Sequence, residues 1–250
     1  MAKDKTGYEE RKEERTLAVM AHDIKAPLSA IVSILGVIEK GYVKDFDKVK
    51  ELVSRASQKA ETIIAMVNDI LDYSLLADKS MMKKEPVKLF DVLKDSISTI
   101  TPYAIDRNIT LTYNLHPCEG KKINGIYTFL LRAFNNIIMN AIKYNKEDGK
   151  IAIHFSENIG NHTFTITIED TGMGIPEDEL DKIFNIFARG KYAGKNINGG
   201  LGLGLSLVKQ IIEEHDGEIE LTSTLGMGTT IKITLPLLKV KEKKGGTDEL

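Results

Sequence analysis

One histidine in the sequence stands beside a carboxylate on a helical pattern and could act as a nucleophile. His22 and Asp23 lie within Met20–Leu28, and His22 falls one residue off the apolar positions, so its imidazole is expected to face solvent. A neighbouring carboxylate can orient such a ring or accept its proton. The alternative is an inert surface histidine. The remaining histidines have no comparable company, and no set of histidine and cysteine shows zinc spacing: His116, His154, His162 and His215.

A second candidate site consists of two asparagines four residues apart, Asn136 and Asn140, which therefore share one face of a predicted helix. Their amide oxygens could hold a Mg²⁺ ion that keeps most of its water and bridges substrate phosphates. Lys143 and Tyr144 follow within one turn. The alternative is a pair of solvated polar residues, so these asparagines carry weight only together with other motifs.

Two glycine clusters could bind a nucleotide. In Asp170–Pro176, a carboxylate at the end of a predicted strand precedes glycines, so it could accept a hydrogen bond from a ligand amino group where the backbone comes close. The cluster Gly199–Leu205 leads into a predicted helix, whose free N–H groups and N-terminal partial charge favour a phosphate. It is neither a Walker loop nor a dinucleotide fingerprint. The alternatives are a plain turn for the first cluster and a flexible hinge for the second.

Two long helices are predicted to position the histidine. Apolar residues repeat every seven positions with companions offset by four, which is typical of a coiled-coil seam. The first helix carries Leu17, Ala21, Ile24, Leu28, Ile31, Leu35, Ile38 and Tyr42, and the second carries Val49, Val53, Ala56, Ala60, Ile63, Val67, Ile70 and Ala77. Gly41 is expected to close the first helix and Asp45 to cap the second. Because such a hairpin cannot cover its own apolar face, we expect a homodimer through residues 15–79 that forms a four-helix bundle.

The second half mixes helices and strands, which favours an α+β layered domain. Helices are predicted at Leu89–Asp106, Tyr127–Lys146 and Leu203–His215, and strands at Ile109–Leu115, Lys150–Ser156, His162–Asp170, Glu218–Ser223 and Thr229–Leu235, the last four as two hairpins. The predicted domain organisation is a phospho-acceptor hairpin over residues 1–79, a hinge over 80–86, a catalytic domain over 87–238 and a disordered tail over 239–250.

Composition excludes several classes of protein. The 250 residues include 34 Lys and Arg against 36 Asp and Glu, a formal charge of −2, so no basic nucleic-acid surface is expected. One cysteine, Cys118, excludes an internal disulfide framework. We also expect no apolar run of bilayer length and no signal peptide.

In combination these motifs resemble a sensor histidine kinase of two-component signalling. His22–Pro27 resembles the phospho-acceptor box, Asn136–Tyr144 the asparagine box, and Asp170–Gly174 the first glycine box. Phe184 and Phe187 resemble the phenylalanine box, Gly200–Gly204 the second glycine box, and Gly226–Thr229 the last one, all in the family's order. The resemblance covers about residues 15 to 238. It implies an all-α helical hairpin, a four-helix bundle in the dimer, followed by an α+β two-layer sandwich of the Bergerat ATP-binding type.

The resemblance also implies a function: ATP-dependent phosphorylation of His22, then transfer to an aspartate in the receiver domain of a response regulator. It implies that His22, Asp23 and Arg189 are catalytic, that Asn140 and Asn136 hold Mg²⁺, and that Asp170 binds the adenine amino group. The implied ATP-contacting residues are Asn136, Asn140, Lys143, Tyr144, Asp170, Gly172, Gly174, Ile175, Phe187, Gly200, Leu201, Gly202, Leu203, Gly204 and Thr229. Phosphoryl transfer fits these roles because it requires positioning and charge neutralisation above all.

Four positions depart from the family pattern. Ala26 stands where kinases that dephosphorylate their regulator commonly have Thr or Asn, so weak or absent regulator phosphatase activity is expected. Leu201 stands where Thr or Ser is usual, Ile186 replaces a common basic residue, and Arg132 replaces a frequent Gln. The changes at Leu201, Ile186 and Arg132 concern details of lid closure rather than ATP binding.

Other readings remain open at this point. Gyrase-type ATPases, Hsp90-like chaperones and mismatch-repair ATPases resemble the second half but lack the His-Asp box. A dimeric nucleotide-binding scaffold without phosphotransfer, a pseudokinase, is the alternative from another functional class. The expected location is cytoplasmic, as the soluble portion of a membrane-associated sensor kinase.

Overall fold

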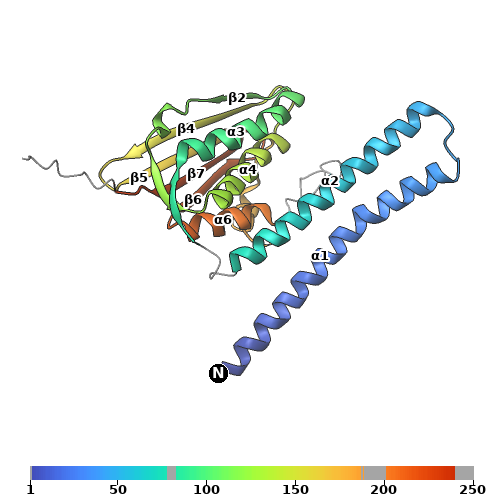
Figure 1. The fold of residues 1–250 in the computed structure, drawn as a ribbon, viewed down its shortest axis with the longest axis horizontal. Coiled ribbons are helices and arrows are strands. Elements are labelled where there is room, and N and C mark those ends of the chain that lie inside the picture. Colours follow the sequence, from blue (N-terminus) through green and yellow to red (C-terminus); the bar gives the residue numbers. More distant parts are fainter. Residues whose placement is uncertain (1, 78–82, 187, 189–200, 240–250) are drawn as a thin grey trace, which may run out of the picture. The chain divides into compact units, whose positions relative to one another are not determined.

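The computed structural model describes residues 2–77, 83–186, 188 and 201–239 (Figure 1). The chain forms two compact units: one contains the helical hairpin together with the described residues 201–203, and the other contains the α/β domain. This division agrees with the predicted fold class, a hairpin of helices followed by a mixed domain.

The hairpin consists of α1 (Ala2–Glu39) and α2 (Phe46–Ala77), which run antiparallel (Figure 1). Gly41 adopts a left-handed φ of +65°, which lets its N–H reach the carbonyl of Ile38 and end the first helix. The side chain of Asp45 then caps α2, because its Oδ1 accepts the N–H groups of Asp47 at 2.9 Å and of Lys48 at 3.2 Å. Both helix-end predictions are confirmed.

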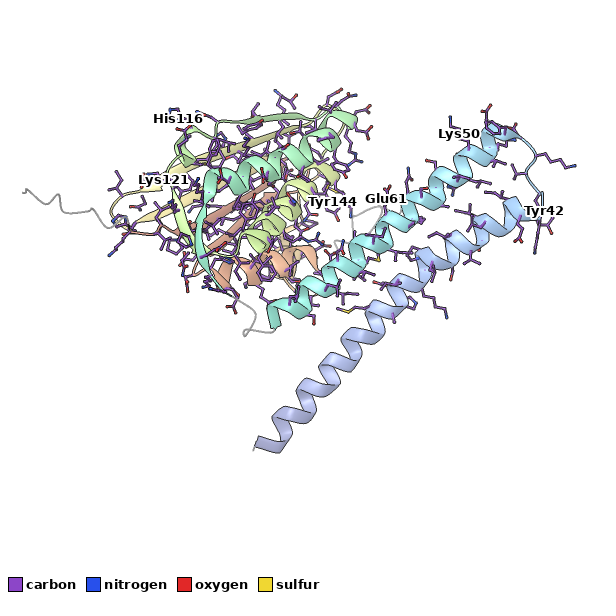
Figure 2. The ribbon with its side chains drawn as sticks, viewed as in Figure 1. Tyr42, Lys50, Glu61, His116, Lys121 and Tyr144 are labelled. Atoms are coloured by element: carbon purple, nitrogen blue, oxygen red, sulfur yellow. The ribbon has the colours of Figure 1, made fainter. Side chains whose placement is uncertain are left out.

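The apolar rows of the hairpin differ in exposure. The row of seven-residue repeats that contains Ile24, Ile31 and Ile63 is half-buried at these positions. Most residues of the second row, which is offset by four positions, are exposed. The large apolar side chains that are exposed on the described parts of the two helices are Leu28, Val32, Leu35, Phe46, Val53, Ile64, Val67, Leu71 and Leu75. Tyr42 does not extend the seam as predicted, because α1 ends at Glu39 and Tyr42 lies exposed in the turn between the helices (Figure 2).

One stretch of α1, Met20–Glu39, is long and apolar enough to cross a membrane by length and composition alone. The prediction that no such run exists was therefore wrong. The reason is the density of the seam: after Lys25 no charged side chain occurs before Glu39. A bundle helix with two apolar rows passes the same test, so the finding is weak evidence for a span.

The α/β domain is built on a five-stranded sheet in the order β2-β4-β5-β7-β6. The strands are β2 (Thr110–Tyr113), β4 (Lys150–Asn158), β5 (Thr163–Asp170), β6 (Glu218–Thr224) and β7 (Gly228–Pro236). β2 runs parallel to β4, and the other pairs are antiparallel. The predicted hairpins β4–β5 and β6–β7 are confirmed, and β2 is shorter than predicted.

Three helices cover one face of this sheet: α3 (Leu89–Asp106), α4 (Tyr127–Lys143) and α6 (Gly204–Glu214) (Figure 1). Strand residues alternate accordingly, and the buried set of β5 is Phe164, Ile166 and Ile168. The domain also contains a short helix α5 (Glu177–Leu180) and a 3₁₀ turn η2 (His116–Cys118). α4 ends three residues earlier than predicted, because the Arg107 guanidinium donates to the carbonyls of Ile142 and Lys143 at the last turn.

The sequence patterns did not predict a two-stranded antiparallel sheet, β1 (Glu85–Lys88) with β3 (Lys122–Gly125). Four-residue strands are too short to show an alternating pattern. The end of the predicted hinge, Glu85 and Pro86, belongs to β1. Residues 80–82 of that hinge and residues 240–250 of the predicted tail lie outside the described residues.

Candidate functional site

Two backbone N–H groups hold the carboxylate of Asp170 in the α/β domain. It stands at the end of β5, where Oδ1 accepts the N–H of Gly172 at 2.7 Å and the N–H of Thr229 at 3.3 Å. Burial raises the pKa of Asp170, while the two backbone N–H groups act in the opposite direction. A carboxylate held this way is pre-positioned to accept a further hydrogen bond from a ligand amino group.

The glycines after Asp170 allow close backbone packing. At Gly172 a side chain would stand 2.5 Å from the carbonyl oxygen of Tyr144. At Gly174, which has a left-handed φ of +67°, a side chain would stand 2.0 Å from the carbonyl oxygen of Thr224. The N–H of Met173 donates to the Tyr144 carbonyl at 3.0 Å. The Asp170 loop is therefore fixed to the C-terminal end of α4, where Figure 2 labels Tyr144.

Two hydroxyl groups support this loop from the β6–β7 hairpin. Ser223 Oγ accepts the N–H of Ile175 at 2.9 Å, donates to the Gly228 carbonyl at 2.8 Å and lies 2.9 Å from Thr229 Oγ1. Thr229 and Ile175, both expected to contact ATP, therefore position Asp170 and its loop through their backbone N–H groups. The sequence analysis missed Ser223, since a serine in an alternating strand gives no signal of a partner 48 residues away.

The asparagines lie on α4 as predicted, and both are half-buried. The Nδ2 atom of Asn136 is shielded from solvent and has no hydrogen-bond partner among the described residues. An unsatisfied buried amide is costly, so it suits a site that a ligand completes. The neighbouring Asn135 serves the fold instead, because its Oδ1 accepts the hydroxyl of the buried Ser96 on α3 at 2.7 Å.

The second glycine cluster brings a helix N-terminus to these asparagines. α6 begins at Gly204, where a side chain would come within 4.0 Å of Asn136 Cγ. Gly202, two residues before this helix, has a left-handed φ of +73°. The start of α6 thus offers N–H groups and a partial positive charge beside Asn136, which is an arrangement that binds phosphate.

Further along α4, the Lys143 ammonium lies 5.2 Å from the ring centre of Tyr144. A hollow of about 550 Å³ adjoins Asp170 and Thr229, but most of its lining, including Glu169 and Thr222, belongs to the sheet face opposite the helices. Phe187, Arg189 and Gly200, predicted to contact ATP or its γ-phosphate, lie outside the described residues. Within the described part of the chain, no group of three His, Cys, Asp or Glu side chains could hold a metal.

His22 is presented to solvent on α1, with its side chain 84% exposed. Its Nδ1 lies 3.4 Å from Asp23 Oδ1, so the carboxylate can keep the proton on Nδ1 and leave Nε2 as the free nucleophilic nitrogen. The hairpin therefore supplies a reactive imidazole, and the α/β domain supplies the polar groups for a nucleotide.

Two other histidines have partners that the sequence analysis did not find. His116 Nδ1 lies 3.7 Å from Glu119 Oε2, and this side chain is 81% exposed. His215 is buried, its Nδ1 bonding the Ile211 carbonyl and its Nε2 accepting the N–H of Ile126 at 2.9 Å. The prediction that no other histidine has company comparable with that of His22 was wrong for His116, since the 3₁₀ turn brings the Glu119 carboxylate close. The hydrogen-bond partners of His215 are backbone groups instead.

Comparison with protein families gives two matches. Residues 12–78 match the His Kinase A (phospho-acceptor) domain, and residues 125–239 match the histidine kinase-, DNA gyrase B-, and HSP90-like ATPase family. Among curated relatives, the sensor protein kinase WalK of Staphylococcus saprophyticus is 31% identical over 91% of this chain and 37% of its own length. WalK of Staphylococcus aureus is 31% identical over 96% of this chain and 57% of the relative. The chain thus spans less than two thirds of these relatives.

Solved structures give a consistent result. The mycobacterial sensor histidine kinase MprB is 27% identical, with a TM-score of 0.51 over 62% of this chain and 100% of that one. The histidine kinase ThkA in complex with the response regulator protein TrrA is 22% identical, with a TM-score of 0.68 over 93% of this chain and 66% of that one, and shows the likeness of fold. The two family matches together cover most of the chain, in the order phospho-acceptor then ATPase, and the chain belongs to the sensor histidine kinase family of two-component signalling.

Proposed function

We propose that this chain is an ATP-dependent protein-histidine kinase that phosphorylates its own His22 and passes the phosphoryl group to an aspartate of a response regulator. The observation that carries the proposal is the division of labour between the two units. One presents an exposed imidazole beside Asp23, and the other contains the ordered carboxylate of Asp170 and the start of α6 next to Asn136. Neither unit alone has both the nucleophile and the groups for its donor.

For the nucleotide, Asp170 would accept a hydrogen bond from the adenine amino group. The phosphates would lie against Asn136, Asn140 and the N–H groups at the start of α6. The residues fit Mg²⁺, because amide oxygens are ligands that it accepts. The unsatisfied Asn136 Nδ2 is a donor, so it would bond to a phosphate oxygen beside the ion. Mg²⁺ held there would supply neutralisation of the phosphate charge. Gly200, Gly202 and Gly204 are proposed to close over the phosphates, and Arg189 is proposed to contact the γ-phosphate.

In the transfer step, Nε2 of His22 attacks the γ-phosphorus. A P–N bond forms, the bond from phosphorus to the β–γ bridging oxygen breaks, and its electron pair leaves with ADP. The ring then carries a positive charge, and its Nδ1 proton passes to Asp23, 3.4 Å away, or to water. Asp23 thus holds the reactive tautomer before transfer and removes charge after it.

The hairpin is proposed to dimerise through residues 15–79. Its exposed Leu28, Leu35, Val53 and Val67 would be covered in a four-helix bundle, which removes apolar surface from water. We assign residues 1–79 to this unit, 80–86 to a hinge, 87–238 to the catalytic domain and 239–250 to a tail. The reaction is proposed to occur in the cytoplasm, in the catalytic portion of a sensor kinase.

The test is phosphorylation with γ-labelled ATP and Mg²⁺. Wild-type protein is expected to acquire an acid-labile, base-stable label that His22→Ala loses. His116→Ala is the matched control, since that histidine is equally exposed and also lies beside a carboxylate. Label on both variants would contradict the assignment of His22, and no label on wild-type protein would favour a scaffold without phosphotransfer.

A further inference from the structure

A row of polar side chains follows one side of α4. Arg132, Asn136, Asn140 and Lys143 are separated by four, four and three residues, so they lie on one face of this helix. Leu130, Phe134 and Ile138 belong instead to the buried side. At 1.5 Å of rise per residue, the row from Arg132 to Lys143 extends about 16 Å along the helix axis. This length is comparable with that of an extended nucleoside triphosphate.

The contacts around α4 give this row a direction. Its C-terminal end adjoins the Asp170 loop, because the N–H of Met173 donates to the Tyr144 carbonyl at 3.0 Å. One helical turn before Asn140, the N-terminus of α6 lies beside Asn136, with 4.0 Å from Asn136 Cγ to the side-chain position of Gly204. A nucleotide whose base lies at Asp170 therefore points its phosphates toward the N-terminal half of α4.

We propose that the Arg132 guanidinium binds the terminal phosphate of this nucleotide; the assignment rests on the proposed function. Arg132 is one turn beyond Asn136, at the end of the row where the γ-phosphate would lie. Its Nε is shielded from solvent, so the base of the guanidinium lies in a low-dielectric environment. A planar guanidinium can donate two parallel hydrogen bonds to phosphate oxygens and offset negative charge during transfer.

This role makes Arg132 a residue that distinguishes ATP from ADP. Asp170, Asn140 and the start of α6 would contact the base and the phosphates that both nucleotides share. Only ATP has the third phosphate that the row places at Arg132. A residue that merely supported the fold would affect both nucleotides alike, so the ratio of the two affinities separates the roles.

The experiment measures binding of ADP and of an ATP analogue with a non-cleavable β–γ link, by titration calorimetry on the full chain with Mg²⁺. Arg132→Gln is expected to weaken the analogue about tenfold or more, as expected for loss of a charge-assisted bond, and to leave ADP unchanged. Arg132→Lys should recover part of the loss because it keeps the charge. Lys94→Gln, which removes an exposed cation from α3, is the matched control and should change neither affinity.

Equal loss of both affinities in Arg132→Gln, or no loss of either, would overturn the assignment of Arg132 while leaving the proposed function intact. Wild-type protein that binds neither nucleotide would overturn both. Thermal unfolding of each variant, measured with and without ADP, shows whether the domain is folded and still binds the shared part of the nucleotide.

Discussion

The helical hairpin and the α/β domain treat their apolar side chains in opposite ways. In the α/β domain, large residues such as Phe134, Phe164 and Ile166 are completely buried between the sheet and its helices. In the hairpin, Leu28 and Leu35 remain about half exposed along one row of α1. The α/β domain contains its own core, whereas the hairpin presents an unfinished one that another helix pair could complete.

The same contrast applies to the chemistry. The Asp170 loop is fixed by hydrogen bonds from two elements and by close glycine packing, so the proposed nucleotide site is pre-organised. His22 has one contact, to its own neighbour, and stands in solvent. A rigid donor site and an accessible acceptor suit a reaction in which the acceptor must meet first ATP and then a second protein.

We expect the largest effect on ATP affinity from removing the Asp170 carboxylate of the α/β domain. Asp170→Ala should lower ATP affinity about a hundredfold, because a buried acceptor for the base and the anchor of the Gly172 and Thr229 N–H groups are lost together. Titration with ATP measures the change. Glu169→Ala, on the exposed neighbour, is the control and should bind as wild type. Equal affinities for the two variants would show that Asp170 does not hold the base.

The unfinished core of the hairpin can be tested by placing a charge in it. Leu28→Glu should convert a dimer into a monomer, since burying an unpaired carboxylate in an apolar interface costs several kcal/mol. Light scattering of wild type, Leu28→Glu and the neighbouring control Ser29→Glu gives the masses. A wild-type monomer, or a dimer that survives the change at Leu28, would refute the predicted bundle.

The glycines of the rigid site permit a matched comparison. Gly174 and Gly226 both have positive φ, but a side chain at Gly174 would meet the Thr224 carbonyl at 2.0 Å while Gly226 has open space. Gly226→Ala should cost about 1 kcal/mol of conformational strain, and Gly174→Ala about 2 kcal/mol more through the backbone clash. Denaturant unfolding measures both free energies. Equal losses would mean that the loop shifts without cost.

The buried His215 predicts a pH dependence of stability in the α/β domain. Burial lowers its pKa, whereas in the unfolded chain it binds a proton near its ordinary value of about 6.5. The unfolded state therefore gains protons first, and stability should fall as pH decreases below about 6.5. Lys84, Glu214 and Asp216 also influence this ring. Melting temperatures between pH 5 and 8 should decline toward acid for wild type and less steeply for His215→Asn; parallel curves would contradict the prediction.

We expect the smallest effect from a substitution at Ala26, near the proposed phospho-acceptor His22. Ala26 is exposed on α1, one turn after His22, and carries no group that could orient a water molecule. Ala26→Thr should therefore increase dephosphorylation of a phosphorylated response regulator in the presence of ADP, with ATP affinity unchanged. Ala26→Ser, which also adds a hydroxyl, and Ala26→Val, which has the shape of Thr without it, are the controls. Rapid dephosphorylation by wild-type protein would contradict the expectation.

Local patterns were sufficient for the parts of this fold that depend on near neighbours. The spacing of Asn136 and Asn140 placed them on one helix face, and Gly41 and Asp45 marked the ends of the hairpin helices. Contacts between distant segments were not predictable in this way. Ser223 supports Ile175 from another strand, and His215 bonds Ile126 across 89 positions, so neither pairing leaves a periodic signal in the sequence.

The short sheet of β1 and β3 was also not predicted, because it pairs segments that a helix and another strand separate in the chain. The two histidine–carboxylate pairs show that a contact seen in the structure does not by itself identify a functional residue. The imidazoles of His22 and His116 are similarly exposed and lie 3.4 and 3.7 Å from a carboxylate, although Asp23 is 21% exposed and Glu119 61%. These distances alone do not show which histidine is the acceptor. The context does, since only His22 lies within the phospho-acceptor match, residues 12–78.

The most direct test of the proposed kinase mechanism is a paired measurement on His22→Ala and Asp170→Ala, which records ATP affinity and phosphoryl label on the same samples. We predict that His22→Ala binds ATP as wild type but acquires no label, whereas Asp170→Ala loses both ATP binding and label. A His22→Ala protein that still becomes labelled, or that no longer binds ATP, would contradict the separation of acceptor and nucleotide site on which the proposed kinase mechanism depends.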